Sequence, residues 1–436
     1  MRQPARQAIP SPPGQFLFGN LRQMQRAGML NYYVDAWKRY GDTIRFKMGP
    51  LSQFLFIKPE HVRHVMMTNA DNYSKGIGFK KLKMLAGEGL LTSDNPIWKR
   101  QRRLMQPPFT AKAVTKFLKP MADSVDGLMG RWHGMAKAGT TLDIGQEMMR
   151  LAMDIIGRTM LSRSLDEEAD ALGPAITAAL HYINDRTVTL VDMPLFVPTA
   201  ENVKFRRAQA VIDTFIGDLI AARRANNDKD DLLSLLIDAR DDEDKTGMTD
   251  QQLRNEIFTV YLAGHETTAQ LLTWTWYLLS QHPEVERNLH AEVDAVLGGR
   301  FPTMEDTRKL SYTFSVIQES MRLYPPVWMM PRDAIQDDEI DGVHVPARSM
   351  VIVSPYLTQR HPDYWAEPLA FQPERFAPDA GRGRLSCSFF PFGAGPRTCL
   401  GIHFATLEAT LILAMVSQTY RLSLTPGCQV QEVAEA

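Results

Sequence analysis

Residues 392–401 read Phe-Gly-Ala-Gly-Pro-Arg-Thr-Cys-Leu-Gly, and this is the strongest pattern in the sequence. Gly393 and Gly395 permit a tight, bulged turn because glycine adopts backbone angles that other residues avoid. An apolar segment at about 400–418 follows and predicts a helix. Cys399 is therefore expected at a helix start, where the helix dipole and free N–H groups favour a thiolate over a thiol. A lone cysteine after a turn is usually an ordinary core residue. A ligand role for Cys399 therefore has to be argued from the residues around it.

A glutamate and two arginines form a second candidate cluster. Glu319 and Arg322 are three residues apart, so in a helix they share a face and can form an ion pair. Arg375, in the segment Pro-Glu-Arg-Phe at 373–376, can bind the same carboxylate as a second, bidentate clamp. A pair of this kind is usually a surface salt bridge, and only its place in the fold can make it structural.

A long buried helix is predicted from Thr249 to about Gln281. Thr249 and Gln252 fit a capping box, and Pro283 follows the last residues. The segment is apolar nearly all round, which is typical of a helix surrounded by protein.

The middle of this helix reads Ala-Gly-His-Glu-Thr-Thr at 263–268. Gly264 leaves room beside the helix, at a cost of about 1 kcal/mol relative to alanine. The Thr267 hydroxyl can bind a preceding carbonyl and distort the helix, and Glu266 supplies an acid beside it. A tolerated polar kink in a core helix is the simpler interpretation if the segment is taken alone.

Together these motifs resemble the cytochrome P450 family. Its haem-binding signature F-G-x-G-x-R-x-C-x-G is matched at every fixed position of 392–401, and its oxygen-activation motif A-G-x-[DE]-T-[TS] is matched at 263–268. The family's E-x-x-R helix and P-E-R-F segment match 319–322 and 373–376, and its W-x-x-x-R helix matches 98–102. The motifs occur in family order over nearly the whole chain. The resemblance implies a mainly α fold with small β-sheets (α+β), the cytochrome P450 fold, with a long central helix over the haem.

The resemblance assigns roles to individual residues. It implies a thiolate-ligated haem b (iron protoporphyrin IX) with Cys399 as the axial ligand, and a proton relay formed by Glu266 and Thr267. The residues expected to form a buried structural network behind the haem are Glu319, Arg322 and Arg375. The residues expected to contact the haem or its propionates, or to shield the sulfur, are Trp98, Arg102, Arg332, Arg397, Phe392, Gly393, Gly401 and Ala263.

The implied activity is that of a haem-thiolate monooxygenase that inserts one atom of O2 into its substrate by hydroxylation or epoxidation. Thiolate donation favours cleavage of the O–O bond, and protons come from positioned side chains. We expect the electrons to come from a separate ferredoxin with its reductase, or from a flavodoxin, that docks near Arg100 and Arg103. The alternatives are a peroxygenase or haem-thiolate isomerase, whose members typically lack the acid–alcohol pair, or a non-catalytic haem sensor.

The substrate is expected to be hydrophobic, because the pocket residues placed by resemblance are mostly apolar. They are Phe79, Leu82, Leu91, Val327 and Trp328. The segment 85–93 resembles that of relatives that oxidise fatty acids, and a terpenoid, steroid or polyketide-like natural product is an equal competitor. Relatives usually continue past 420–430 into a hairpin that reaches the pocket. With Ala436 as the last residue, we expect a shortened chain or a differently built pocket wall.

The composition predicts a compact globular protein that can bury a large core. The chain has 436 residues, of which 44% are hydrophobic, and a net charge of -1, which gives no global reason to expect nucleic acid as a partner. Its three cysteines are too few for a disulfide framework, which favours a reducing cytoplasm. Around Arg2 and Arg6 there is no apolar stretch suited to a signal peptide, and no segment has the ~18 apolar residues of a membrane span.

We therefore expect a soluble cytoplasmic protein with a single domain at 1–436. Its β-rich parts are predicted at about 1–75 and 330–398, and its helical parts at about 93–330 and 400–418.

Overall fold

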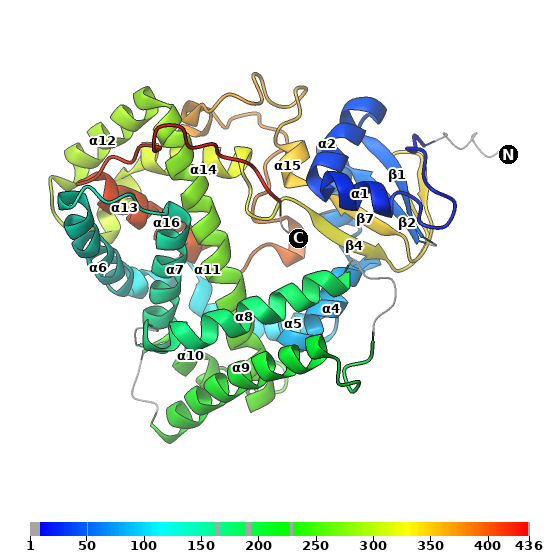
Figure 1. Ribbon diagram of the computed structural model, residues 1–436, viewed down its shortest axis with the longest axis horizontal. Coiled ribbons are helices and arrows are strands. Elements are labelled where there is room, and N and C mark those ends of the chain that lie inside the picture. The colour runs from blue at the N-terminus through cyan, green and yellow to red at the C-terminus, as the bar shows by residue number, and fades with distance from the viewer. Residues whose placement is uncertain (1–8, 50, 163–165, 188–192, 227–229, 435–436) are drawn as a thin grey trace. The chain divides into compact units, whose positions relative to one another are not determined.

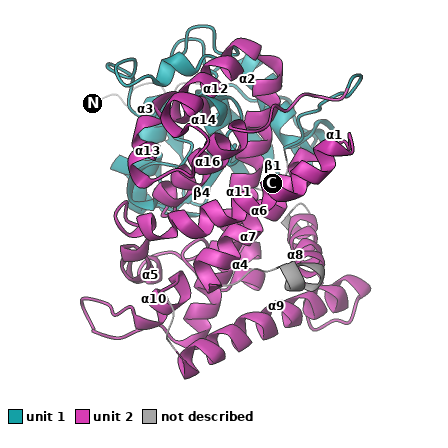
Figure 2. Cartoon of the chain, turned by 90° about the vertical axis from the view of Figure 1, so that its left-hand side faces the viewer, with its two compact units in different colours: residues 1–77, 318–399, 426–436 teal, residues 78–317, 400–425 magenta. Residues whose placement is uncertain are grey.

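The computed structural model describes residues 9–49, 51–162, 166–187, 193–226 and 230–434, so Arg2 and Arg6 lie outside it. The chain forms two compact units, which Figure 2 shows in different colours. Unit 1 comprises residues 1–77, 318–399 and 426–436, and unit 2 comprises residues 78–317 and 400–425. Helices predominate and the described strands all belong to unit 1, which confirms the predicted mainly α class with small sheets. The single-domain description stays a prediction.

Unit 1 contains the strands and several short helices. The strands are β1 (Thr43–Met48), β2 (Leu51–Phe56), β3 (Tyr73–Lys75), β4 (Met330–Ala334), β5 (Asp338–Ile340), β6 (Val343–Val345) and β7 (Met350–Val353). The α-helices are α1 (Leu21–Ala27), α2 (Met29–Tyr40), α3 (Pro59–Arg63) and α15 (Pro355–Thr358). The other helical turns are the π-helix η1 (His64–Thr68) and the 3-10 turns η2 (Ala70–Asn72), η5 (Pro373–Phe376) and η6 (Gly395–Arg397).

The main sheet of unit 1 has the strand order β1-β2-β7-β4-β3, and β5 pairs with β6 in a separate hairpin. β1 and β2 are antiparallel, whereas β2 and β7 are parallel, with Phe54 opposite Val351. Side chains alternate along β2: Leu55 packs on one face of the sheet, and Phe54 and Phe56 pack on the other. The apolar runs at 54–56 and 350–353 lie in β2 and β7, within the parts of the chain predicted to be β-rich.

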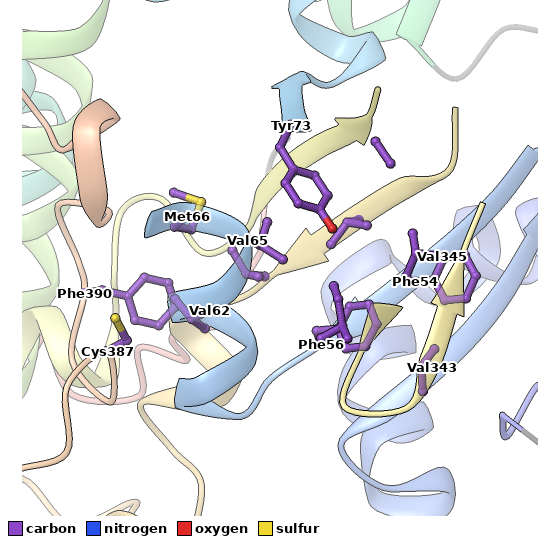
Figure 3. Packing of buried hydrophobic residues seen from close by; sticks show 14 residues of the cluster. Phe54, Phe56, Val62, Val65, Met66, Tyr73, Val343, Val345, Cys387 and Phe390 are labelled. Atoms are coloured by element: carbon purple, nitrogen blue, oxygen red, sulfur yellow. The ribbon is translucent and has the colours of Figure 1, made fainter. Parts of the chain in front are cut away.

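Each face of this sheet is covered by a different part of unit 1. Leu55 packs against residues of α1 and α2, and Figure 1 shows these two helices beside β1 and β2. On the other face, Phe54 and Phe56 form a cluster with Val62, Met66 and the β5–β6 hairpin, which Figure 3 shows from close by. Burial on both faces explains why β2 and β7 are nearly continuous apolar runs.

Among the described residues, unit 2 contains helices joined by turns and loops, and no strands. Its helices are α4 (Ile77–Ala86), α5 (Ile97–Met105), η3 (Pro107–Phe109), η4 (Ala113–Phe117), α6 (Leu118–Lys137), α7 (Ile144–Leu161), α8 (Asp166–Thr187), α9 (Ala200–Ala225), α10 (Leu232–Asp238), α11 (Asp250–Gln281), α12 (Pro283–Leu297), α13 (Met304–Lys309), α14 (Ser311–Leu323) and α16 (Ile402–Ser417). The last residues of α14 belong to unit 1, and the first residue of α4 does as well.

The predicted long helix is present as α11. Thr249 is its N-cap and forms the capping box with Gln252 in both directions, with Thr249 Oγ1 accepting at 3.2 Å and the Thr249 N–H donating at 3.0 Å. The helix ends at Gln281, just before Pro283. Within unit 2, α11 packs against α7, α9 and α16, so it is covered on several sides, as its apolar sequence indicated.

Candidate active site

The turn before Cys399 is built by two glycines in the left-handed region. Gly393 has φ +74° and Gly395 has φ +70°, which L side chains rarely adopt. The turn is closed by the Thr398 N–H donating to the Gly395 carbonyl at 3.1 Å and by the Cys399 N–H donating to the Phe392 carbonyl at 2.8 Å. The Cys399 side chain is exposed at the end of this turn.

The relation of Cys399 to the next helix differs from the expectation. α16 begins at Ile402 with Gly401 as its N-cap, so Cys399 precedes the helix instead of occupying its first turn. The reason is that the Cys399 N–H is used to close the glycine turn, and the first helical hydrogen bond runs from the Ala405 N–H to the Gly401 carbonyl at 2.8 Å.

Three further residues expected at the haem lie in unit 1. Phe392 and Arg397 are half-buried on either side of the glycine turn, and Arg397 is the last residue of η6. Arg332 is buried on β4, opposite Val351 of β7, and its Nη1 donates to the Pro331 carbonyl at 2.8 Å.

Glu319, Arg322 and Arg375 are brought together in unit 1. Arg322 holds Glu319 bidentately, with Nε to Oε2 at 2.7 Å and Nη2 to Oε1 at 2.8 Å, and both side chains are fully buried. Arg375 Nε lies 3.4 Å from Glu319 Oε1. The bidentate contact with Glu319 is therefore made by Arg322 on the same helix. The prediction that Arg375 makes this bidentate contact is wrong. The Gln372 N–H completes the carboxylate shell by donating to Oε1 at 2.9 Å.

Gln359, which no motif indicated, links this network to the cysteine turn. Its Nε2 donates to the carbonyls of Met321 and Arg322 at 3.0 and 3.2 Å. Its Oε1 accepts the Phe390 N–H at 2.9 Å, and the Phe390 carbonyl accepts the Gly393 N–H at 2.9 Å. A fully buried amide that satisfies both its donor and its acceptor in this way fixes the spacing between α14 and the turn.

The centre of α11, in unit 2, has the predicted distortion-prone pattern. Thr267 Oγ1 donates to the Ala263 carbonyl at 2.6 Å, and Ala263 is exposed. A Cβ added at Gly264 would lie 2.7 Å from Cδ1 of Ile156 on α7, so glycine here allows the close packing of the two helices. Glu266 is half-buried, and its Oε1 accepts a long hydrogen bond of 3.4 Å from Gln270.

Two buried carboxyl groups in unit 2 were missed by the sequence motifs. Glu408 of α16 accepts a hydrogen bond from Thr268, and Glu256 of α11 accepts the Leu90 N–H at 2.9 Å. Burial raises the pKa of each carboxyl to about 8, against a weaker lowering by its hydrogen-bond donor. Both groups are therefore largely neutral near neutral pH. Glu408 could have been noticed as a glutamate in an otherwise apolar stretch, whereas Glu256 directly follows Arg254 and Asn255 and has no such pattern.

The segment 87–93, expected near the substrate, lies closely against α11. Gly87 has φ +62°, and a Cβ added there would lie 2.3 Å from Asn255 Oδ1. A Cβ added at Gly89 would lie 2.5 Å from Thr259 Oγ1. The two glycines thus allow the backbone of this segment to lie close to Asn255 and Thr259 of α11. Leu91, which follows them, is half-buried.

The sequence alone favours a solvated surface for the basic residues Lys99, Arg100 and Arg103, but in the structure both arginines are paired with carboxylates. Arg100 Nε lies 3.6 Å from Asp241 and 3.5 Å from Asp244, and Arg103 lies 3.0 Å from Asp241 and 2.9 Å from Glu243. The acidic loop between α10 and α11 therefore neutralises both arginines, a contact between residues too distant in sequence to be predicted. Lys99 is exposed, as expected.

The remaining α5 residues and the pocket candidates differ in burial. Trp98 is buried and Arg102 is half-buried on α5. Phe79 and Leu82 are half-buried on α4, and Val327 is exposed.

Trp328, a candidate pocket residue, is buried in the core of unit 1. It is only 7% exposed, and its ring lies 6.1 Å from that of Tyr33 in the cluster under α1 and α2. Its carbonyl accepts the Ser354 hydroxyl at 2.7 Å. An aromatic residue after two prolines has the same composition whether it lines a pocket or fills a core, which is why the sequence could not separate the two.

Comparison with known proteins identifies the family. The cytochrome P450 family model matches residues 9–436. The chain is 35% identical to cyclooctatin synthase of Streptomyces melanosporofaciens, with 97% of this chain and 91% of that protein covered, and 34% identical to pentalenene oxygenase of Streptomyces avermitilis, with 96% and 92% covered. The crystal structure of the cytochrome P450DA haem domain matches with a TM-score of 0.88 at 26% identity, covering 97% of this chain and 93% of that one.

This chain belongs to the cytochrome P450 family and is a monooxygenase. The family uses a thiolate-ligated haem, and a monooxygenase of this kind consumes O2 and electrons. No helix in the described part of the chain is long and apolar enough to cross a membrane. Among the described residues, no group of three or more His, Cys, Asp or Glu side chains is placed to hold a metal ion.

Proposed function

We propose that Cys399 is the axial thiolate ligand of haem b. The observation that carries this proposal is the exposed Cys399 side chain at the end of a turn closed by Gly393 and Gly395, in a chain of the cytochrome P450 family. The fit is chemical as well as geometric, because a thiol is a soft ligand suited to iron. Gly393 and Gly395 have no side chain that could cover the Cys399 sulfur.

The other haem contacts are proposed on the same basis. Trp98, Arg102, Arg332 and Arg397 would bind the propionates, since guanidinium groups hold carboxylates in a fixed, bidentate geometry. Phe392 would shield the sulfur. Gly393, Gly401 and Ala263 would let the flat ring approach the backbone, because each has little or no side chain.

Bound haem supplies the reduction of O2 and the transfer of one oxygen atom to the substrate. The protein's own task is to deliver protons without admitting bulk water. Thr267 donates its only hydroxyl proton to the Ala263 carbonyl, so its oxygen is left as an acceptor that can hold a proton donor in place. We propose that Glu266, one residue earlier on α11, is the exchangeable acid of this relay.

The proposed substrate class is a terpenoid. Pentalenene oxygenase and cyclooctat-9-en-7-ol 5-monooxygenase, both of Streptomyces, are similar to this chain over 96% and 92% of its length. The candidate pocket residues Phe79, Leu82 and Leu91 are apolar, as a hydrocarbon skeleton requires. Lys80, Lys81 and Lys83 are the lysines that could hold a fatty-acid carboxylate, and the fatty-acid alternative is weakened because Lys83 is already paired with Glu88 at 3.1 Å.

Two measurements test this function. The ferrous carbon monoxide adduct should show the red-shifted Soret band of thiolate ligation, and Cys399→His should abolish that band. A band typical of imidazole ligation in the unmutated protein contradicts the assignment. Spectral titration of the ferric protein should give a spin-state change with cyclic terpenoid hydrocarbons or alcohols, and a response to long-chain fatty acids alone would contradict the substrate class.

We propose a separate ferredoxin with its reductase, or a flavodoxin, as the electron donor. The acidic residues beside Arg100 and Arg103 compensate their charges, so Lys99 is the residue of the basic run best placed to attract an acidic partner. Lys99→Glu should slow reduction by such a donor at low salt and leave substrate binding unchanged. Lys137→Glu, a reversal on α6, is the control, and equal effects of the two reversals count against docking at α5.

A further inference from the structure

Asp338 is the centre of a hydrogen-bonded cluster in unit 1 that no motif includes. Its Oδ2 accepts hydrogen bonds from Asn69 Nδ2 at 2.9 Å and from the Tyr73 hydroxyl at 2.6 Å, and lies 2.8 Å from His64 Nε2. Its Oδ1 accepts the Glu339 N–H at 2.8 Å. Asp338 begins β5, whereas the three side chains come from the segment 64–73. One carboxyl group therefore ties the β5–β6 hairpin to that segment.

The cluster is suited to a charged carboxylate. Burial alone would raise the pKa of Asp338, but the donors Tyr73, His64, the Glu339 N–H and Asn69 together hold its pKa below the usual range. Burial and the neighbouring carboxylate raise the pKa of Tyr73, so its hydroxyl stays a donor. Hydrogen bonds to a charged acceptor are about twice as strong as those between neutral groups.

The segment that Asp338 holds contains the π-helix η1. His64 is the first residue of η1, and Asn69 follows its last residue, with the Asn69 N–H donating to the His64 carbonyl at 2.9 Å. Both of these residues bind Asp338. A single π-helical turn is rare and poorly stabilised by its own backbone, so a side chain that binds both of its ends fixes its conformation.

The same π-helical turn supports the turn before Cys399. Met66 lies in the middle of η1, and a Cβ added at Gly395 would lie only 2.0 Å from the Met66 carbonyl oxygen and 3.1 Å from the Met67 Cα. The Met66 side chain belongs to the buried cluster that also contains Phe390, and Figure 3 shows both at the same end of that cluster. The glycine turn therefore packs backbone to backbone on η1, with no flexible side chain between them.

We propose that Asp338 is a positioning residue for Cys399, acting through His64, Asn69 and the π-helical turn on which Gly395 packs. This inference rests on the proposed role of Cys399 as the haem ligand. When the carboxylate is removed, η1 is expected to relax toward an ordinary helical turn. The Met66 carbonyl would then shift against Gly395, and the sulfur would lose its fixed position.

The experiment compares Asp338→Asn with Asp341→Asn in the full, haem-loaded chain. Asp341 lies on the same hairpin but binds Lys58 and His61, each at 3.2 Å, and both precede η1 in the chain. Hydrogen exchange of the amides at 64–69 and 393–399 should become about fivefold faster in Asp338→Asn. It should be unchanged in Asp341→Asn. The ferrous carbon monoxide spectrum of Asp338→Asn should show a larger share of the form without the thiolate band.

Several outcomes overturn the inference. It fails if the two variants behave alike, or if exchange rises as much in β2 and α16 as in 64–69 and 393–399, because that would be general destabilisation. Tyr73→Phe removes only one of the donors to Asp338, so it should increase hydrogen exchange at 393–399 by a smaller factor than Asp338→Asn does. If exchange does not increase in Tyr73→Phe, the inference is also overturned. If the unmutated protein shows no thiolate band, the ligand role of Cys399 is contradicted. This outcome differs from those that contradict the positioning role of Asp338.

Discussion

The Thr268 hydroxyl donates a 3.1 Å hydrogen bond to Oε2 of Glu408 and joins the middle of α11 to α16 within unit 2. Thr268 is 3% exposed and Glu408 is 1% exposed, so this polar contact lies in an otherwise apolar interface. Thr268 directly follows the proposed relay residue Thr267. A carboxyl group in this position stays protonated near neutral pH because burial raises its pKa to about 8.

The first prediction concerns the pH dependence of stability. The folded pKa of Glu408, about 8, lies above its ordinary value of 4.5, so between these pH values the folded protein holds a proton that the unfolded chain releases. The free energy of unfolding therefore falls as the pH rises through this window, by up to about 1.4 kcal/mol per pH unit. Glu408→Gln keeps an acceptor for Thr268 and removes the titration, so its stability should fall less steeply with pH.

Urea unfolding of the wild type and Glu408→Gln at several pH values from 5 to 8 measures this slope. Glu284→Gln, which replaces an exposed glutamate on α12, is the matched control and should leave the slope as it is. Parallel curves for the wild type and Glu408→Gln would show that Glu408 is ionised in the folded protein.

The second prediction concerns Glu256 and the segment 87–93. Glu256→Ala leaves the Leu90 N–H without its acceptor, whereas Glu256→Gln keeps one. We expect Glu256→Ala to lose about 1–3 kcal/mol of stability and to expose the Leu90 amide to hydrogen exchange. Glu256→Gln should protect that amide as the wild type does, and equal exchange in the two variants would mean that Glu256 does not hold the segment.

The third prediction separates the two arginines around Glu319. Arg322 donates to both carboxylate oxygens and to the carbonyls of Gln359, Pro368 and Ala370, so Arg322→Ala leaves a buried charge and several acceptors unpaired. We expect a loss of about 3–5 kcal/mol. Arg375→Ala removes a longer contact of 3.4 Å with Glu319 and an exposed 3.0 Å hydrogen bond to the Glu367 carbonyl, and should cost about 1 kcal/mol.

Denaturant unfolding of both variants tests this ranking. If Arg322→Ala does not accumulate, Arg322→Lys is the second variant. A lysine keeps the charge but cannot hold Glu319 bidentately, so it should still lose more stability than Arg375→Ala. The opposite order would show that Arg375 carries the network.

The sequence predicted those features that depend on neighbours in the chain. The ends of α11 follow from Thr249, Gln252 and Pro283, and the turn before Cys399 follows from its glycines, because capping and left-handed backbone are local properties.

Contacts between distant segments could not be predicted in the same way. Asp241 neutralises Arg100 and Arg103, and Asp338 binds a segment more than two hundred residues earlier, but neither aspartate has a distinctive local pattern. The burial of Trp328 against Tyr33 likewise depends on how α2 covers the sheet. Pairings of this kind are set by tertiary packing, which periodicity and spacing do not encode.

The last prediction tests why α11 has glycine at 264. Alanine there would gain about 1 kcal/mol of helix propensity, but its Cβ would lie 2.7 Å from Ile156 Cδ1, and overpacking of this kind costs about 1–3 kcal/mol. Gly264→Ala alone should therefore be neutral to destabilising. Ile156→Val removes the crowded methyl group. The double variant should therefore lose less unfolding free energy than the two single variants lose in sum, with a coupling of at least about 0.5 kcal/mol. Unfolding free energies of the four proteins of this double-mutant cycle measure the coupling, and strictly additive effects would mean that Gly264 is required for a reason other than its contact with α7.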